Sequence, residues 1–445
     1  MSDRGGRRCA ILPASMSAER QIVSTVRGLL DGHRVATVAV VSVDDQAAKK
    51  FVEALGEDVN VSTHNDVEQL AGLSDLDILI ANKALSKNVN HPEKLDEFVK
   101  SALKAVRFGG VVIVREDLKD AQDGKQVARL TDYFDVFRVA VDGKNTGLEL
   151  YAVEEVEDSL YAHQNWLDFY WSFTKKEFPQ TTGENVTFRD FLDKTQYTDT
   201  GIYAYEWIFG DNFISPGGYE ENLKVIKRFG DLRAGQTMLD IGVGIGGGAR
   251  QVANEFGVHV KGIDLSSNML AVALERVQKE KDARVRYSIT DALVYKFVPN
   301  SFDYVFSRDC IQHIPDTELL FSRIYDSLKP GGKVLITMYG CGYGELSEKF
   351  KAYVAQRHYF LKNLKQIEEI AKKTGFTNIY TENLTGRFKE ILGEERSRVE
   401  DNKEEFLSKF SQKEYDSLVR GWGDKLGYIA DDNHNWNLFL AEKPF

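Results

Sequence analysis

Apolar and polar positions alternate in a repeated order through the middle of the chain. Between Thr237 and Tyr339, short runs rich in β-branched and aromatic residues are separated by longer runs with apolar residues at helical spacing. The pattern predicts strands at 237–241, 258–263, 285–289, 302–306 and 333–338, and helices at 248–256, 268–279 and 316–328. Strands that alternate with helices form a parallel sheet covered by helices, so this region is predicted to be an α/β domain.

A glycine-rich loop follows the first of these strands. Residues 240–248 read DIGVGIGGG, with five glycines, and the next predicted strand ends at Asp264. Glycines let the backbone turn sharply and approach a nucleotide-like ligand without Cβ clashes. The spacing Gly242-x-Gly244-x-x-Gly247 also satisfies the dinucleotide pattern, which is weak by itself. Nicotinamide, another cofactor and a tight turn without a ligand therefore stay open at this point.

The first 155 residues resemble a weaker copy of the same pattern. Segments 77–80 and 108–113 correspond to segments 303–306 and 330–335. The loop at 13–19, where the glycines would be expected, reads PASMSAE and contains none. We therefore predict that the N-terminal half keeps the fold without the cofactor loop. A chance likeness between two α/β domains is the alternative.

These observations predict a chain of three parts. Residues 1–158 would form a degenerate α/β domain, 159–185 a helical linker and 186–445 the cofactor-binding domain. The linker is predicted from aromatic residues at helical spacing between 160 and 178, namely Trp166, Phe169, Tyr170 and Phe173. Residues 345–425 are mostly charged and are predicted to be helical.

Composition narrows the possible partners. The net charge of −11 over 445 residues argues against a nucleic-acid partner, which needs a basic surface. No stretch approaches the ~20 consecutive apolar residues of a membrane span. Three scattered cysteines are too few for a disulfide or zinc framework, so we expect a cytoplasmic protein without a metal site.

Acidic residues follow several of the predicted strands in a fixed order. Asp240 precedes the glycine loop, and Asp264, Asp291 and Asp309 come at or after later strand ends. The segment LKPGGKVLI at 328–336 then gives a helix stop, a turn and a strand. This ordered set resembles class I S-adenosylmethionine (SAM) methyltransferases, which have a Rossmann-like fold. The resemblance implies that Asp264 accepts the ribose hydroxyls and Asp291 the adenine amine, as carboxylates can.

Further segments resemble one family within this class, the phosphoethanolamine N-methyltransferases. They read QYTD at 196–199, YEWIFG at 205–210, FISPGG at 213–218, SRDCIQH at 307–313, YVAQRHY at 353–359 and GWGDK at 421–425. A chain with a C-terminal catalytic domain and a degenerate methyltransferase-like N-terminal half looks like the nematode form. That form methylates phosphomonomethylethanolamine and phosphodimethylethanolamine to phosphocholine, a step toward phosphatidylcholine in phospholipid metabolism. Action on phosphoethanolamine itself is left open.

The chemistry of such a reaction asks for a way to remove a proton. An alkylammonium with a pKa of ~10.4 is neutral in only about one molecule in a few thousand at pH 7, which adds roughly 4–5 kcal/mol to the barrier. In the family a Tyr–His pair takes this proton, and by resemblance it corresponds to Tyr197 and His313. Asp309 would orient the amine.

The resemblance also implies the remaining binding residues. For the cofactor, besides Asp264 and Asp291, they are Tyr205, Ile214, Ser215, Gly242, Leu265, Ala292 and Arg308. For the phosphobase they are Gln196, Tyr339, Tyr353, Arg357, Tyr359 and Lys425. Tyr353 and Arg357 are four positions apart and share a helix face, whereas Tyr359 can join them only if the helix ends at that point.

Two other functions stay open from the sequence. One is a SAM-dependent methyltransferase for another small amine or a sterol, which would have no use for a phosphate-binding cluster. The other is a non-enzymatic regulator that binds SAM or a phosphobase, against which the set of Tyr197, Asp309 and His313 argues.

Overall fold

The computed structural model describes residues 17–30, 37–85, 92–117, 125–156, 168–180, 185–280 and 282–445. The chain forms two compact units. The smaller comprises residues up to 120, 139–148 and 155–177, and the larger comprises 121–138, 149–154 and 178–445. The larger unit thus includes two segments that precede residue 155.

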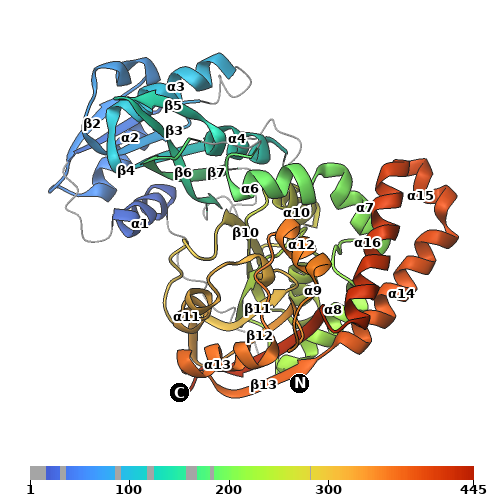
Figure 1. The fold of residues 1–445 in the computed structure, drawn as a ribbon. Helices are drawn as coiled ribbons and strands as arrows, with labels where there is room; N and C mark the ends of the chain where they lie inside the picture. Colours follow the sequence, from blue (N-terminus) through green and yellow to red (C-terminus); the bar gives the residue numbers. More distant parts are fainter. Residues whose placement is uncertain are drawn as a thin grey trace, which may run out of the picture. The chain divides into compact units, whose positions relative to one another are not determined.

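The smaller unit is built on a mixed sheet (Figure 1). Its parallel strands are β2 (Asn60–His64), β1 (Thr37–Ser42), β3 (Leu76–Asn82) and β4 (Val106–Asp117), in that order, and β7 (Asp168–Glu177) pairs antiparallel with β4. Strand β5 (Arg138–Val141) pairs with β6 (Lys144–Glu155). The helices are α1 (Ala18–Leu30), α2 (Asp45–Leu55), the 3-10 turn η1 (Val67–Gly72) and α3 (Pro92–Ala105). The predicted α/β fold of the N-terminal half is confirmed.

Strand β7 corrects the predicted linker helix. Residues 168–177 are extended, and Val112 and Val114 of β4 lie opposite Phe173 and Trp171. Phe169, Tyr170 and Phe173 are buried along with their neighbours. A strand covered on both faces carries apolar residues at successive positions, so its period of two is hidden and a helical spacing can appear by chance. Trp166 lies outside the described residues.

The larger unit contains the predicted parallel sheet. Its strand order is β13, β14, β12, β11, β8, β9, β10 and then the 149–154 segment of β6. The five parallel strands are β8 (Thr237–Ile241), β9 (His259–Asp264), β10 (Val285–Thr290), β11 (Phe302–Arg308) and β12 (Leu328–Gly340). All five predicted strands are confirmed. The helices between them are α9 (Gly247–Phe256), α10 (Ser267–Glu280) and α11 (Thr317–Ser327), which confirms the predicted helices.

Several helices and helical turns of the larger unit precede β8 in the chain. They are α4 (Lys125–Val136), α6 (Phe188–Phe191), the π-helical turn η2 (Leu192–Gln196), α7 (Asp199–Phe209), α8 (Gly218–Ile226) and the turn η3 (Lys227–Phe229). Helix α4 packs against α10.

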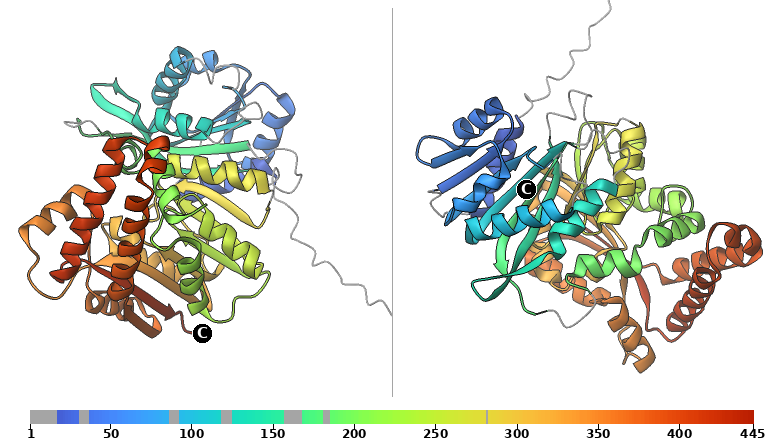
Figure 2. Two further views of the ribbon diagram at one scale, coloured as in Figure 1. Left: turned by 90° about the vertical axis from the view of Figure 1, so that its right-hand side faces the viewer. Right: turned by 90° about the horizontal axis from the view of Figure 1, so that it is seen from above.

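The C-terminal region is helical as predicted but also contains two strands. Its helices are α12 (Glu348–Arg357), α13 (Leu364–Thr374), α14 (Thr385–Asp401), α15 (Lys403–Lys409) and α16 (Gln412–Ala430). The strands are β13 (Thr377–Asn383) and β14 (Asn435–Glu442), which pair with each other and place β14 antiparallel against β12. Figure 2 shows α14 and α16 side by side in orange and red. An apolar cluster from α14, α16 and β14 surrounds Tyr339 at the end of β12.

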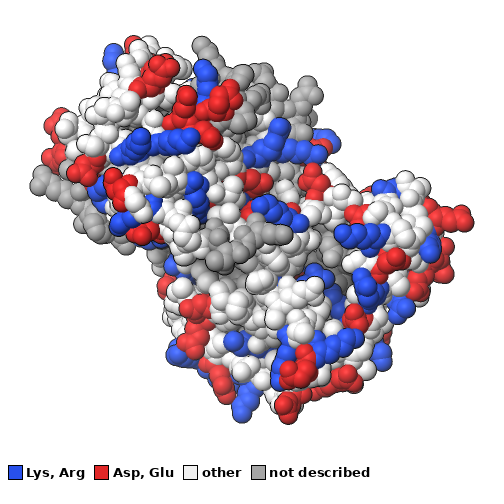
Figure 3. All heavy atoms as spheres, turned by 45° about the horizontal axis from the view of Figure 1, so that its top comes forward, with Lys and Arg blue, Asp and Glu red and all other residues white. Residues whose placement is uncertain are grey.

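Surface charge is mixed in sign. Lysine and arginine alternate with aspartate and glutamate over the face drawn in Figure 3. Within the described ranges, no helix is long and apolar enough to span a bilayer.

Candidate active site

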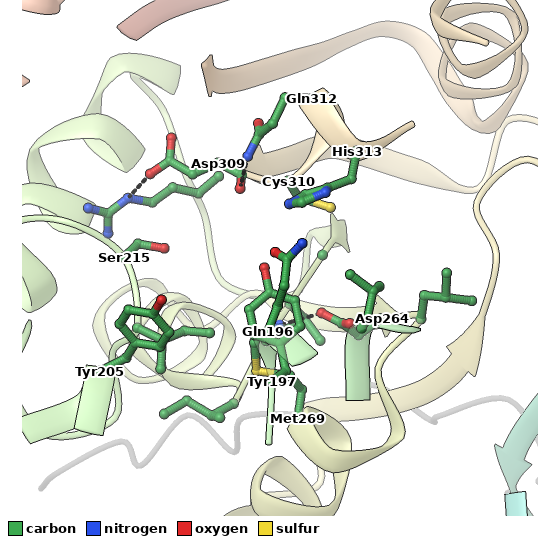
Figure 4. Close-up of a pocket in the computed structure, with 18 of the residues that line it drawn as sticks. Gln196, Tyr197, Tyr205, Ser215, Asp264, Met269, Asp309, Cys310, Gln312 and His313 are labelled. Carbon is green, nitrogen blue, oxygen red and sulfur yellow. Dashed lines mark hydrogen bonds and ion pairs between the residues drawn. The ribbon is translucent and has the colours of Figure 1, made fainter. Parts of the chain in front are cut away.

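A cavity in the larger unit lies at the carboxyl ends of β8, β9, β10 and β11 (Figure 4). In open α/β sheets this edge is where ligands bind. The loops after these strands form one wall of the cavity. Further lining comes from the segment between α6 and the loop before α8, from the ends of β12 and α12, and from the middle of α14 and of α16.

The glycine loop is shaped for close approach to a ligand. Gly242 and Gly244 have φ values of 77° and 58°, in the left-handed region that favours glycine. A Cβ on Gly242 would lie 2.3 Å from Cys310 Sγ, and one on Gly247 would lie 1.9 Å from the carbonyl oxygen of Asn212. Glycine is therefore required at both positions by the surrounding chain.

Two carboxylates at successive strand ends fit a nucleoside. Asp264 at the end of β9 accepts the Gly244 N–H at 2.8 Å on Oδ2 and the Ser266 N–H at 2.9 Å on Oδ1. Burial raises its pKa to about 6. Asp291, one residue after β10, accepts the Leu293 N–H at 2.7 Å. These anchored carboxylates and the glycine backbone fit the ribose, adenine and close backbone contact of SAM.

Arg308 anchors the loop before α8, which lines the cavity. Its guanidinium donates to the Gly218 carbonyl at 3.2 Å, to Asn222 Oδ1 at 3.2 Å and to the Pro216 carbonyl. Ile214 and Ser215 of this loop line the cavity. The structure thus gives Arg308 a loop-anchoring role beside any direct cofactor contact.

Asp309 presents one free carboxylate oxygen. Its Oδ1 accepts from Trp436 Nε1 at 2.6 Å and from Thr337 Oγ1 at 3.0 Å. Its buried Oδ2 has no hydrogen-bond partner among the described residues and lies 3.9 Å from Arg308 Nε. Burial raises the pKa of Asp309, while Arg308 and the two donors act in the opposite direction. An unsatisfied buried acceptor of this kind suits a cationic ligand.

Two half-buried cations, Arg357 and Lys425, line the same cavity. Within the part of the chain that the structure describes, neither Arg357 nor Lys425 forms an ion pair with a carboxylate. Burial and the neighbouring Arg357 lower the pKa of Lys425 to about 8. Tyr339 and Tyr359 line the same region, and Lys425 Nζ lies 5.2 Å from the centre of the Tyr339 ring. This cluster lacks an anion.

The end of helix α12 decides how these residues are arranged. The helix stops at Arg357 because His358 has a left-handed φ of 53°. Tyr359 therefore reaches the cavity beside Arg357, as the sequence required. Tyr353, in contrast, does not line the cavity; its ring lies 5.9 Å from that of Tyr359, behind it.

Tyr197 and His313 both line the cavity but do not touch through a hydrogen bond in the described structure. Burial raises the pKa of Tyr197 well above its ordinary value, so the phenol is neutral. Burial, with Arg357 and His358, lowers the pKa of His313 to about 4, so its imidazole is neutral at pH 7. Its Nδ1 is buried and has no hydrogen-bond partner among the residues that the structure describes.

The structure thus gathers all but one of the predicted site residues around a single cavity. Those that line it, besides the residues already placed, are Gln196, Tyr205, Leu265 and Ala292. Tyr353 is the exception. Sequence reasoning missed Trp436 and Thr337, which hold Asp309, and Gln312, whose Nε2 donates to the Asp309 carbonyl at 2.6 Å. Gln312 could have been predicted from the sequence, because it lies inside the segment 307–313 that resembles the family.

Fold and site together define a Rossmann-like methyltransferase domain. A family model described as methyltransferase domain matches residues 238–332, and one described as phosphoethanolamine N-methyltransferase 2 N-terminal matches residues 16–179. The chain is 65% identical to phosphoethanolamine N-methyltransferase 2 of Caenorhabditis elegans, over 97% of this chain and 99% of that protein. The chain belongs to the phosphoethanolamine N-methyltransferase family.

Solved structures of a Haemonchus contortus relative, phosphoethanolamine N-methyltransferase 2, have the same fold. One, in complex with phosphomonomethylethanolamine and S-adenosylhomocysteine, is 61% identical with a TM-score of 0.93, over 96% of this chain and all of that one. Another, in complex with SAM, is 61% identical with a TM-score of 0.94, over 97% of this chain and 100% of that one.

Proposed function

We propose that this chain transfers methyl groups from SAM to the nitrogen of phosphomonomethylethanolamine and phosphodimethylethanolamine, giving phosphocholine. One observation carries the proposal: the same cavity is lined by two cations that pair with no carboxylate of the described residues, and by one carboxylate oxygen, Asp309 Oδ2, that has no hydrogen-bond partner among them. A phosphobase has a phosphate at one end and an ammonium group at the other, so the two charge patterns are complementary. The ligand of the Haemonchus relative, phosphomonomethylethanolamine, has this form.

The phosphate end binds by charge and by donors. Burial acts against the charged form of Arg357, yet its pKa stays above the ordinary value because the neighbouring phenols, Tyr359 first, favour the cation. Its planar guanidinium can bind a phosphate through two hydrogen bonds, and Lys425 adds a point charge. A bound phosphate would raise the lowered pKa of Lys425, so phosphobase affinity should fall as the pH rises through about 8.

The ammonium end must lose a proton before methyl transfer. SAM supplies an electrophilic methyl group, which only a neutral nitrogen lone pair can attack. With the ammonium held at Asp309 Oδ2, the Tyr197 oxygen accepts the amine proton while the phenol proton passes to neutral His313. After methyl transfer, S-adenosylhomocysteine leaves without the sulfonium charge, one positive charge stands on the methylated nitrogen and the other stands on the His313 imidazolium. The side chains must approach one another for this transfer, because they are not hydrogen-bonded in this structure.

For the N-terminal part we propose a degenerate domain over residues 1–158 that does not bind SAM. In the smaller unit the carboxyl ends of β3 and β4 carry a buried polar network. Arg115 pairs with Asp168 through two hydrogen bonds of 3.0 and 2.9 Å and donates to Asn82 at 3.2 Å. These side chains occupy the carboxyl edge of the smaller unit's sheet. In the larger unit, the glycine loop lies at the corresponding edge. Residues 13–16 of the corresponding loop lie outside the described residues.

We also propose a cytoplasmic location. Cys310 and Cys341 are free thiols in the described structure, and burial raises the pKa of both. A protein with half-buried free thiols suits a reducing compartment.

A methylation assay tests the function. Purified chain with labelled SAM should methylate phosphomonomethylethanolamine and phosphodimethylethanolamine, with phosphocholine as the final product. Arg357→Ala should weaken acceptor binding by ~1.5–3 kcal/mol, the typical cost of a lost hydrogen bond to a charged group, and leave SAM binding nearly unchanged. Lys349→Ala, at an exposed position of the same helix, is the control.

Two outcomes would refute the proposal. Turnover of a sterol or a small amine without phosphate, and not of phosphobases, would point to another methyltransferase. SAM and phosphobase binding without any turnover would point to a regulator.

A further inference from the structure

A buried polar network holds the segment that carries Tyr197. Arg189 of α6 is almost fully buried, at 3% exposure. It donates to Asp193 Oδ2 at 2.9 Å, to Ser267 Oγ at 3.0 Å and to Asp135 Oδ2 at 2.9 Å. We name the set Asp135, Arg189, Asp193, Ser266 and Ser267 the clamp. Its members come from α4, α6, η2 and the start of α10.

One side of the clamp reaches the cofactor site. Asp193 accepts from Ser266 Oγ at 2.5 Å and from Ser267 Oγ at 2.5 Å. Ser266 in turn donates its backbone N–H to Asp264, the carboxylate at the end of β9. The clamp therefore ties η2 to the backbone that presents the ribose-binding acid.

The same segment ends at the predicted proton acceptor. Phe188, Leu192, Gln196 and Tyr197 line the cavity, and the Tyr197 carbonyl accepts from Asn268 Nδ2 at 2.9 Å. Residues 188–197 thus form a short wall of the cavity that is fastened at both ends. A small displacement of this wall would move the Tyr197 phenol away from the amine.

The remaining contacts that hold residues 188–197 come from α4, a helix that precedes them by about fifty residues in the chain. Asp135 is buried and accepts on Oδ2 from Arg189 Nε and from Thr187 Oγ1, the latter at 2.8 Å. Asp132 on the same helix also accepts from Arg189. Although α4 lies within residues 1–158, it belongs to the compact unit that holds the cavity.

We propose that the N-terminal part of the chain serves catalysis through α4, with Asp135 as a positioning residue that fixes the wall at 188–197 and so places Tyr197. Buried charge pairs add little net stability compared with apolar packing, but they define one geometry, because each charge is costly without its partner. Arg189, with three carboxylates around it, has one position that satisfies them. This inference rests on the proposed function for its kinetic readout.

The test is a double-mutant cycle in the full chain. Asp135→Asn keeps the shape of the side chain and removes its charge. We expect kcat for phosphomonomethylethanolamine to fall ~10-fold, because the conformation that places Tyr197 beside the amine is populated less often. In a Tyr197→Phe background the same change should cost less than ~2-fold, since the group it positions is gone. Arg129→Gln, on the exposed face of α4, is the matched control and should leave kcat unchanged.

Equal losses in both backgrounds, or a lower melting temperature with unchanged kcat, would overturn the inference. Should Asp135→Asn fail to fold, Arg189→Lys keeps the charge but cannot reach all three carboxylates, and the same cycle applies to it. Calorimetric SAM affinity gives a readout independent of the acceptor, and it should be weakened ~5-fold or more by Asp135→Asn but not by Arg129→Gln. An inactive wild type would refute the proposed function, whereas an active wild type with an additive cycle would refute the role of Asp135.

Discussion

At the scale of single residues, the site works by leaving selected polar atoms without partners. Asp309 has a left-handed φ of 53°, which is uncommon for a residue other than glycine. This conformation is fixed by the surrounding hydrogen bonds on the backbone and on Oδ1, and Oδ2 stays free. Arg357 and Lys425 likewise form no ion pair with a carboxylate of the described residues. Such costs are offset only when a ligand of opposite charge binds, which gives the site its selectivity.

The proton step gives a prediction at this scale. Tyr197→Phe and His313→Ala should each lower kcat strongly, by up to the roughly 4–5 kcal/mol that deprotonation requires. Since the two residues act as a unit, the double variant should be little worse than either single one. Calorimetric SAM affinity should be nearly unchanged in both.

The pH dependence of these variants separates proton transfer from positioning. Raising the pH toward ~10 supplies more neutral amine from solution. It should therefore partly restore kcat in the Tyr197→Phe and His313→Ala variants. The measurement uses saturating acceptor, because loss of charge on Lys425 above about 8 weakens phosphate binding over the same range. Losses that add and that do not recover at high pH would mean that the pair only positions the amine.

At the scale of elements, the C-terminal strand β14 completes the site. It lies antiparallel against β12, so that Trp436 is the register partner of Tyr339. The indole is fully buried and donates to Asp309 Oδ1, so that Oδ2 is left without a hydrogen-bond partner among the described residues. The last strand of the chain thereby fixes a carboxylate that follows the fourth strand of the parallel sheet.

Trp436→Phe removes this donor and keeps most of the packing. Loss of a hydrogen bond to a charged group, at ~1.5–3 kcal/mol, should lower kcat/KM for the acceptor by about 10- to 100-fold, while SAM affinity changes little. Steady-state kinetics and calorimetry measure the two effects. Trp207→Phe removes a surface donor to Glu405 and is the control. A change of the same size in both variants would show that Trp436 acts through stability alone.

At the scale of the whole molecule, the larger unit includes segments from before residue 155. Strand β10 pairs with residues 152–154 of β6, and Thr290 donates to the Tyr151 carbonyl at 2.6 Å, one residue before Asp291 of the cavity. Helix α4 adds the clamp carboxylates. A catalytic domain cut at Val186 would lack both supports.

This organisation predicts how fragments behave. A fragment covering 186–445 should bind SAM, because the glycine loop and Asp264 are intact, but with at least ~10-fold lower affinity and a lower melting temperature than the full chain. An N-terminal fragment covering 1–158 should not bind SAM. Calorimetry and thermal unfolding of each fragment check this. Affinity of the 186–445 fragment equal to that of the full chain would show that these supports are dispensable.

The sequence alone was sufficient for the parallel sheet, the glycine loop and the acids at the strand ends. These features depend on local rules: β-branched runs form strands, and glycine marks a turn whose backbone has positive φ, as at Gly242 and Gly244. Family resemblance added residues that are far apart in the chain but lie in matching segments. All but Tyr353 of these line one cavity.

Only the tertiary structure decided the rest. Residues 168–177 form a strand because they pair with the backbone of β4 and because the core covers both of their faces. The spacing of apolar residues within 168–177 indicates neither of these contacts. Trp436 and Asp135 support the site through contacts with residues 127 and 54 positions away. Local sequence does not determine such pairings, because a polar side chain can hydrogen-bond to many kinds of group. The tertiary fold decides which distant group comes within reach.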